Sequence, residues 1–298
     1  MKKTGFIALV GRPNVGKSTL MNTILGEKVA IVSHKPQTTR NRILGIETRG
    51  DDQYVFMDTP GLFNPRNSLG DYMVKAANLT LKTADAVILV VDAGREPGDV
   101  EKNVIKVLKN MKLPGVLAVN KIDQYDKEAI AKCIASYARL HDFEAVVPIS
   151  ARSGKHVDEL MDECSRFLHE CEDWFYDADD FTDQSMRQMA SEIIREKILR
   201  TTNKEVPHGV AVVIEEYKET DSLVSIRADI YVEKDSHKGI LVGKGGANLK
   251  QIGTYAREDL EKLLGTKVFL DLWVRVKSNW RESAAMVTNL GYRDKDLT

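Results

Sequence analysis

Apolar residues follow two different rhythms along the first 170 positions of the chain. Short, almost continuous apolar runs alternate with longer stretches in which apolar residues recur every three to four positions. The runs predict strands buried on both faces, and the longer stretches predict amphipathic helices that cover them. The strands are expected at residues 6–10, 54–57, 86–91, 116–119 and 145–149, and the helices at residues 18–25, 69–83, 100–111, 127–140 and 156–168. This alternation is typical of an α/β domain with a mostly parallel sheet and helices on both faces.

The last third of the chain has a different order of elements. A helix expected at residues 184–201 precedes strands at 209–216 and 223–233. Two helical stretches separated by a glycine-rich loop come next, followed by a third strand and a helix at 279–290. The second strand alternates cleanly, because its apolar residues would all face one side: Val224, Ile226, Ala228, Ile230 and Val232. We therefore predict a second, smaller α+β domain.

An acidic stretch separates the two patterns. Residues 170–180 contain six acidic and no basic side chains and show little periodicity. We predict a first domain at residues 1–170, an acidic linker at 171–183 and a second domain at 184–298. A length of 298 residues also fits two cores better than one.

Charge and cysteine content narrow the functional classes. The net charge is −1 and neither predicted domain is strongly basic, so a nucleic-acid surface would have to be a local patch. Three cysteines without a C-x-x-C pair predict reduced thiols in a cytosolic protein. No apolar run reaches the roughly 18 residues that a membrane span needs.

The clearest chemical signal follows the first predicted strand. Residues 11–18, GRPNVGKS, match the phosphate-binding pattern GxxxxGK[ST] between a strand and a helix. Glycines let the backbone wrap a phosphate, Lys17 would neutralise the β- and γ-phosphates, and Ser18 would ligate Mg²⁺. The predicted phosphate-binding set is Gly11, Arg12, Pro13, Asn14, Val15, Gly16, Lys17, Ser18 and Thr19.

A second loop begins at the end of the strand at residues 54–57. Asp58 would hold a Mg²⁺-bound water, and the Gly61 amide would reach the γ-phosphate, with Thr59 and Pro60 between them. Such an Asp-x-x-Gly pattern is common, and a plain turn is the alternative interpretation. Its position at a strand end favours the nucleotide site.

Two further loops point to guanine. The Asp123 carboxylate, in the run Asn120–Lys121–Ile122–Asp123 after a strand, can accept hydrogen bonds from both N1 and the exocyclic amine of guanine. Adenine lacks this pair of donors, so a site built on these groups rejects it. The turn of Ser150, Ala151 and Arg152 follows the next strand and would offer amides to the guanine O6, with an ordinary turn as the alternative. The expected ligands are GTP or GDP with Mg²⁺.

These four loops, in this order at strand ends, resemble the P-loop GTPases related to translation factors. The resemblance implies that residues 35–40, KPQTTR, form the first switch segment, in which one threonine completes the Mg²⁺ shell in the GTP state. Thr39 is favoured over Thr38, because relatives with a Thr-Thr-Arg run use the second threonine. The implied catalytic residues are Lys17, Thr39, Asp58 and Gly61.

The residue after Gly61 differs from the Ras-type enzyme. Leu62 stands where that enzyme has a glutamine that orients the attacking water, so slow intrinsic hydrolysis is expected. Resemblance to other GTPases with an apolar residue here implies stimulation by K⁺ held partly by Asn14. The alternative is that Asn14 only shapes the loop.

A glycine-rich loop in the last third, residues 243–246 (GKGG), offers a second site. Its glycines would let a nucleic-acid backbone approach, and Lys244 would contact a phosphate. The order of elements around it resembles the type II KH fold, which clamps about four nucleotides against such a loop. The expected RNA-binding set is Gly243, Lys244, Gly245, Gly246 and Lys250, with further basic residues at Lys234, Lys238, Arg257, Lys262 and Lys267. The alternative is a KH-like domain that contacts protein.

One GTPase domain followed by a KH domain resembles the Era family over essentially the whole chain. This implies a monomeric, cytoplasmic ribosome assembly factor that binds single-stranded rRNA near the 3′ end of 16S rRNA in the small (30S) subunit, with GTP favouring RNA binding. It also implies loose association with the cell membrane, and no DNA partner is expected. The alternatives are a membrane-associated or cell-cycle regulatory GTPase whose KH-like domain docks protein, and a metabolic kinase or ATPase, against which Asp123 argues.

Overall fold

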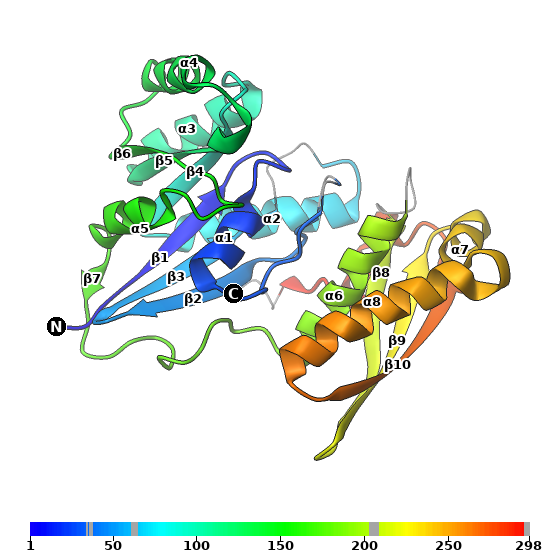
Figure 1. Ribbon diagram of the computed structural model, residues 1–298. Coiled ribbons are helices and arrows are strands. Elements are labelled where there is room, and N and C mark those ends of the chain that lie inside the picture. Colours follow the sequence, from blue (N-terminus) through cyan, green and yellow to red (C-terminus); the bar gives the residue numbers. More distant parts are fainter. Residues whose placement is uncertain (34, 36–37, 61–64, 203–208, 295–298) are drawn as a thin grey trace.

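The computed structural model describes residues 1–33, 35, 38–60, 65–202 and 209–294. Figure 1 shows a larger domain built on one sheet beside a smaller domain built on another. The elements of the larger domain are β1 (Lys3–Val10), α1 (Lys17–Leu25), β2 (Ile43–Arg49), β3 (Asp52–Asp58), α2 (Ser68–Thr83), β4 (Ala86–Asp92), α3 (Asp99–Met111), β5 (Gly115–Asn120), α4 (Lys127–Ala138), β6 (Ala145–Pro148), α5 (Val157–Ser165) and β7 (His169–Glu170).

The sheet of the larger domain has the strand order β2-β3-β1-β4-β5-β6, with β7 paired to β1. Strands β3, β1, β4, β5 and β6 run parallel to one another, whereas β2 is antiparallel to β3 and β7 is antiparallel to β1. The prediction of a mostly parallel sheet is therefore confirmed, but it missed β2. That strand carries a glycine in its short apolar part, and a Cβ at Gly45 would come within 2.8 Å of Leu25 in α1.

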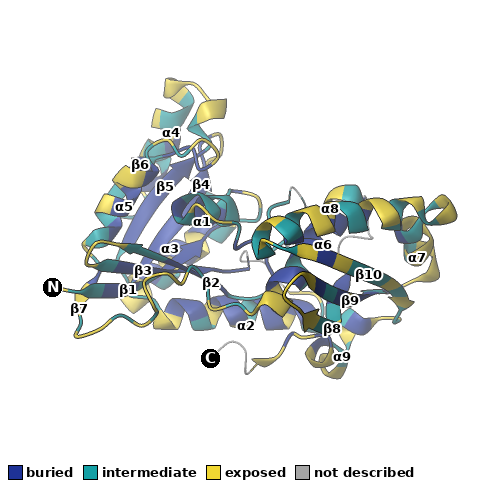
Figure 2. Ribbon diagram, turned by 60° about the horizontal axis from the view of Figure 1, so that its bottom comes forward, coloured by how far each residue is buried: buried dark blue, intermediate teal, exposed yellow. Residues whose placement is uncertain are grey.

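Helices bury both faces of this sheet, and Figure 2 shows its central strands in the buried colour. Alternate residues of β1 enter different cores: Ile7 and Leu9 pack with α1 and α5, whereas Ala8 and Val10 pack on the side of α3 and α4. Because both sides are covered, the strand is apolar almost throughout. The loops that carry the motifs follow the carboxyl ends of the parallel strands, at one edge of the sheet.

The smaller domain contains α6 (Met186–Thr201), β8 (Ala211–Glu219), β9 (Leu223–Val232), α7 (Asp235–Val242), α8 (Ala247–Leu264), β10 (Lys267–Val276) and α9 (Ala284–Asn289). Its sheet has the order β10-β9-β8, with β10 parallel and β8 antiparallel to β9. The predicted apolar face of β9 is confirmed, since Val224 to Val232 at every second position are buried against α6 and α8.

The predicted helix at residues 279–290 is wrong in its extent. A short 3₁₀ turn, Trp280–Glu282, is followed by α9, which begins after Ser283. The Ser283 side chain accepts a hydrogen bond from the Met286 amide, and a capping serine of this kind starts a new helix. The pattern of apolar residues spans the break, so periodicity alone did not reveal it.

Residues 171–185, after β7 and before α6, form neither helix nor strand, and they lie along the larger domain. The Phe175 ring is 5.1 Å from the Phe6 ring, and Thr182 Oγ1 donates to the Leu44 carbonyl. The acidic stretch is thus held to the surface of the first sheet. Among the residues that the structure describes, no helix has the length and apolar character to cross a membrane.

An apolar cluster joins the two domains. Tyr72 and Met73 of α2 pack with Trp280, Val287 and Tyr292 of the second domain. Trp280 is fully buried, and its Nε1 donates to the Gly209 carbonyl at 2.9 Å. This packing holds the second domain beside the loop that contains Thr39.

Candidate functional site

The loop between β1 and α1 curves over the side chain of Lys17. Lys17 Nζ donates to the carbonyls of Gly11 at 3.1 Å and Arg12 at 3.0 Å. The lysine is 6% exposed, and burial lowers its pKa, although the negative charge of Asp58 opposes the shift. Gly16 has φ 106°, and a Cβ there would lie 2.2 Å from the Asn120 amide nitrogen, so only glycine fits.

Three oxygen-bearing side chains converge beside this loop. Ser18 Oγ donates to Asp58 Oδ2 at 2.6 Å, Thr39 Oγ1 donates to the same oxygen at 3.1 Å, and the two hydroxyls are 3.1 Å apart. Burial raises the pKa of Asp58, which is fully buried, and its other oxygen, Oδ1, has no hydrogen-bond partner within the described residues. Mg²⁺ is a hard cation that prefers oxygen ligands, so the residues present fit Mg²⁺.

The two candidate threonines occupy different surroundings. Thr39 lies with Ser18 and Asp58, whereas Thr38 Oγ1 donates to the Lys35 carbonyl at 2.7 Å. Both residues line the same cavity. The geometry therefore favours Thr39 as the residue that would join the metal shell.

Asn120 connects three of the loops. Its Nδ2 donates to the Val15 carbonyl at 2.7 Å, and its Oδ1 accepts from the amides of Lys121 at 2.8 Å and Ala151 at 2.9 Å. The side chain is 3% exposed. Asn120 thus holds the phosphate loop against the loops expected to bind the base.

Asp123 is exposed at the other end of the cavity, with one carboxylate oxygen anchored. Ser150 Oγ donates to Asp123 Oδ1 at 2.7 Å, which fixes the orientation of the carboxylate. Lys121 Nζ pairs with Asp92 at 2.7 Å. A carboxylate oriented in this way can accept the paired donors of guanine.

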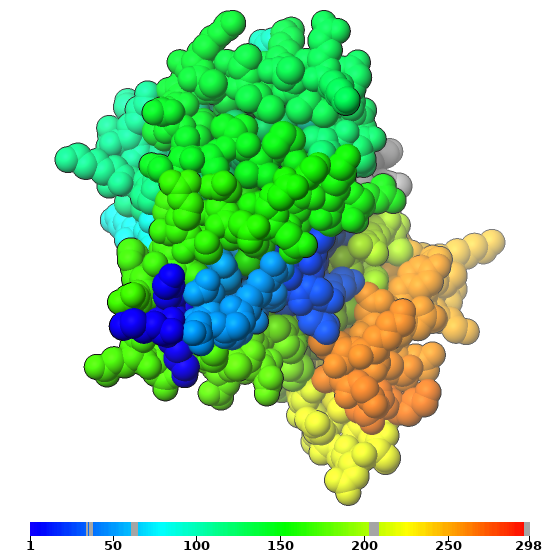
Figure 3. Space-filling model, turned by 60° about the vertical axis from the view of Figure 1, so that its left-hand side comes forward, coloured from blue at the N-terminus to red at the C-terminus, as the bar shows by residue number. Residues whose placement is uncertain are grey.

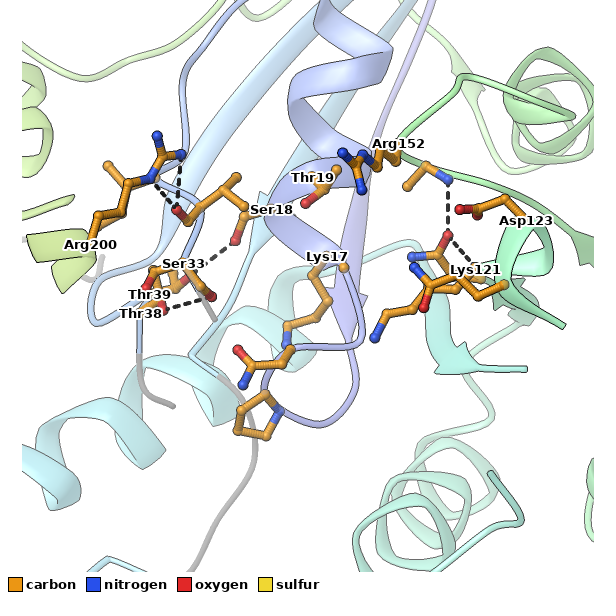
Figure 4. A pocket seen from close by; sticks show the side chains of 18 residues that line it. Lys17, Ser18, Thr19, Ser33, Thr38, Thr39, Lys121, Asp123, Arg152 and Arg200 are labelled. Carbon is orange, nitrogen blue, oxygen red and sulfur yellow. Dashed lines mark hydrogen bonds between the residues drawn. The ribbon is translucent and has the colours of Figure 1, made fainter. Parts of the chain in front are cut away.

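These groups border one cavity of about 560 Å³, within the usual range of small-molecule sites. In Figure 4, Asp123 and Arg152 lie on one side, Arg200 and Ser33 lie on the other, and Lys17 and Ser18 lie between them. The predicted residues that line the cavity are Pro13, Asn14, Gly16, Lys17, Ser18, Thr19, Thr38, Thr39, Asn120, Lys121, Asp123, Ala151 and Arg152.

Other predicted residues do not line the cavity. Gly11 and Val15 are buried, Arg12 pairs with Glu101 at 2.6 Å, and the Thr59 hydroxyl donates to the Leu9 carbonyl at 3.0 Å. Pro60 is also buried. Gly61 and Leu62 lie outside the described residues.

The cavity also has lining residues that the motifs did not predict. Ile31, Val32 and Ser33 form a wall after α1, Gln124 follows Asp123, and Arg200 comes from α6 of the second domain. None belongs to a recognised loop pattern. Arg200 is 182 positions from Ser18, and no local signal in the sequence links the two.

The second domain holds the segment around Thr39 from both sides. The Arg195 guanidinium donates to the Thr38 carbonyl, and Arg40 Nη1 donates to the Val210 carbonyl at 2.6 Å and to the Tyr292 hydroxyl at 2.9 Å. Arg40 is 3% exposed. The predicted switch segment is therefore in direct contact with the domain that carries the glycine-rich loop.

The glycine-rich loop between α7 and α8 is open to solvent. Gly245 has φ 59° and Gly246 has φ 79°, and a Cβ at either would meet nothing within 4 Å. Asn248 Nδ2 supports the loop from beneath by donating to the carbonyls of Ile240 at 3.1 Å and Leu241 at 3.2 Å. The positive φ values require glycine, and the empty space allows another backbone to approach.

Exposed basic side chains lie in this loop and along the elements that flank it in sequence. Lys244 lies within it and Lys250 lies in the first turns of α8, and both are exposed. The same exposure holds for the other basic residues predicted nearby, which are Lys234, Lys238, Arg257, Lys262 and Lys267. Lys262 and Lys267 lie at the opposite end of α8 from the loop, so Lys244 and Lys250 are the basic residues best placed to act with it.

Comparison with known proteins adds independent information. A family model described as 50S ribosome-binding GTPase matches residues 6–121, and a KH domain model matches residues 205–281. GTPase Era of Clostridioides difficile is 48% identical over 99% of this chain and 100% of its own length. GTPase Era of Ruminiclostridium cellulolyticum is 47% identical over 98% of both chains. The prediction of a GTPase domain followed by a KH domain is thus confirmed.

Two solved structures superpose on almost the whole chain. A structure of Era in complex with MgGDPNP and nucleotides 1506–1542 of 16S ribosomal RNA gives a TM-score of 0.94 at 38% identity, and covers 98% of this chain and 99% of that one. A point variant of Era from Aquifex aeolicus bound to GDP.AlF4⁻ gives 0.93 at 38% identity, and covers 97% of this chain and 99% of that one.

Proposed function

The chain belongs to the Era family of GTPases, and from that premise we propose that its GTP hydrolysis controls the binding of single-stranded rRNA in small-subunit (30S) assembly. The proposed target lies near the 3′ end of 16S rRNA, as in the relative bound to nucleotides 1506–1542. The observation that carries the proposal is one cavity bordered by Lys17, Thr39 and Asp123 in a chain that also presents the open loop at residues 243–246.

The nucleotide would lie across the cavity from Asp123 to Thr39. Asp123, oriented by Ser150, would accept hydrogen bonds from guanine, and the Ala151 region would face its O6. Lys17 and the loop amides would bind the phosphates. Ser18 and Thr39, with Asp58 behind them, would hold Mg²⁺, which offsets phosphate charge when bound.

Hydrolysis would depend on positioning and charge. We propose that Lys17, Thr39, Asp58 and Gly61 act at the γ-phosphate, Gly61 through its backbone amide. Leu62 cannot orient water, so the intrinsic rate would be slow. Asn14 lines the cavity at φ 66°, and we propose that it helps to hold K⁺, which supplies positive charge to the transition state.

RNA would bind at the exposed loop of the second domain. Gly245 and Gly246 allow the RNA backbone to approach, while Lys244 and Lys250 would contact phosphates. Gly243 is the first glycine of the loop, and a Cβ added there would clash with the Asn248 side chain at 2.9 Å. The affinity would then depend strongly on salt concentration.

The contacts of Arg195 and Arg40 support coupling between the two events. Because these contacts tie the residues on either side of Thr39 to the second domain, a nucleotide that orders Thr39 would also favour the observed arrangement of the domains. We propose boundaries at residues 170 and 184 for the two domains. A cytoplasmic monomer with peripheral membrane contact remains part of the proposal on family grounds alone.

The test is RNA binding in defined nucleotide states. Wild-type protein is titrated with an RNA of the 3′ end of 16S rRNA in the presence of Mg²⁺ and either GDP or a non-hydrolysable GTP analogue. We expect tighter binding with the analogue. Equal binding in both states would contradict nucleotide control, and the absence of RNA binding in both would favour a KH-like domain that docks protein.

A further inference from the structure

One residue in the wall of the nucleotide cavity comes from the second domain. Arg200, in the last turn of α6, lines the cavity beside Val32 and Ser33. Its Nη2 donates to Glu196 Oε1 at 3.0 Å, and Nε and Nη2 are 3.4 Å and 3.3 Å from the Val32 carbonyl. The side chain is 51% exposed, so these contacts leave a large part of the guanidinium accessible.

A charge cluster around the buried Glu196 holds Arg200 in this place. Glu196 is fully buried, accepts the Val32 amide at 3.0 Å and pairs with Lys28 at 2.5 Å. Asp259 of α8 pairs with Lys28 at 2.7 Å and also with Lys197. Figure 3 shows the blue segment after α1 next to the orange α8. The end of α6 is therefore fastened to the segment that forms the cavity wall.

The cluster has an excess of positive charge. Its bases are Lys28, Lys197 and Arg200, and its acids are Glu196 and Asp259. The remaining wall residues Ile31, Val32 and Ser33 are uncharged. Arg200 is the member of the cluster that borders the cavity, where its half-exposed guanidinium is accessible. A guanidinium offers several donors in a plane that suits phosphate oxygens.

Arg200 also lies at the end of the cavity remote from Asp123, the residue expected to bind guanine. In Figure 4 it is on the opposite side from Asp123, with Lys17 and Ser18 between the two. Phosphate oxygens, rather than guanine, are therefore the acceptors expected nearest to it.

We propose that Arg200 completes the nucleotide site from the second domain by contacting phosphate oxygens of the bound guanine nucleotide. This inference rests on the proposed nucleotide site. The nucleotide is then held by both domains at once, and its binding stabilises the position of α6 against the larger domain. By linkage, if a ligand that shifts α6 changes nucleotide affinity by some factor, the nucleotide changes the affinity of that ligand by the same factor.

The test compares variants of the full-length protein by calorimetric titration with GDP and with a non-hydrolysable GTP analogue, both with Mg²⁺. Arg200→Ala is expected to weaken both by about tenfold, as for loss of a charged hydrogen bond. Arg200→Lys keeps the charge without the planar donors, so it is expected to lose less nucleotide affinity than Arg200→Ala. The effect of Arg200→Ala should shrink as salt concentration rises.

Two control variants separate nucleotide contact from a structural role. Lys28→Ala removes a partner of Glu196 and Asp259 that does not line the cavity. Arg187→Ala removes an arginine of α6 whose Nη2 donates to the Glu215 carbonyl at 3.4 Å and which does not line the cavity either. We expect Arg187→Ala to retain wild-type affinity, and Lys28→Ala to lose less affinity than Arg200→Ala, because Glu196 still accepts from Arg200 and from the Val32 amide. If Lys28→Ala weakens nucleotide binding as much as Arg200→Ala, the cluster acts through structure alone and the proposal is wrong.

Hydrogen exchange supplies a second measurement. Nucleotide should protect the last turn of α6 in the wild-type protein and give much less protection in Arg200→Ala. If the wild-type protein binds nucleotide and Arg200→Ala binds it with the same affinity, this inference is wrong and the proposed function stands. Failure of folded wild-type protein to bind either nucleotide would instead refute the proposed function itself.

Discussion

The two candidate sites of this molecule are built in opposite ways. In the cavity, the binding groups are already tied to one another: Asn120 joins three loops, Ser150 orients Asp123, and Lys17 is held by carbonyls of its own loop. At the glycine-rich loop, Gly245 and Gly246 face empty space and Lys244 is exposed. The first design favours selectivity, because a mismatched ligand leaves buried polar groups unpaired. The second favours charge-driven binding that tolerates different sequences.

The largest effect is expected from the buried cation of the enclosed site. Lys17→Ala should weaken GTP binding by about a thousandfold, since truncating one partner of a desolvated charge pair costs roughly 2–5 kcal/mol. Calorimetric titration measures it. Lys82→Ala, at an exposed position at the end of α2, is the control and should bind normally. Near-normal affinity in Lys17→Ala would refute the phosphate-loop assignment.

A smaller effect on affinity, but a change in selectivity, is expected at the base. Asp123→Asn places a donor where guanine also donates, so the preference for GTP over xanthosine triphosphate should fall by about a hundredfold. Competition between the two nucleotides gives this ratio directly. If the variant still selects GTP as the wild-type protein does, Asp123 does not bind the base.

The exposed loop should respond differently to a comparable change. Lys244→Glu is expected to weaken RNA binding by about tenfold, with nucleotide affinity unchanged, because one phosphate contact becomes repulsive. Filter binding at several salt concentrations measures both affinity and salt slope. Lys82→Glu makes the same charge change on the other domain and should have little effect. RNA affinity that survives Lys244→Glu would favour a protein-docking role for the domain.

The smallest expected effect concerns the monovalent cation. GTP hydrolysis should be about fivefold faster in KCl than in NaCl at equal ionic strength, because a cation near Asn14 would offset transition-state charge. Asn14→Ala should reduce the difference between the two salts. Identical rates of the wild-type protein in both salts would eliminate the cation proposal.

The strands, the loops that follow them and the buried face of β9 could be predicted from the sequence. Four loops follow predicted strands, and parallel strands present their carboxyl ends at one edge of a sheet, so the loops of Lys17, Asp58 and Asp123 were expected to converge. Alternation in β9 likewise predicted which face is buried, because side chains of a strand point to opposite faces in turn. These features depend on short-range sterics and burial, which neighbouring residues encode.

The tertiary structure alone decided which side chains meet across the domains. Within the first domain, only the resemblance to relatives favoured Thr39 over Thr38, and the structure adds that Thr39, not Thr38, lies with Ser18 and Asp58. Arg195 contacts the switch segment, and Arg200 enters the cavity wall from a helix that carries no nucleotide motif. Such contacts depend on how two separately patterned domains pack together, and the sequence around each residue contains no periodicity that reports this packing.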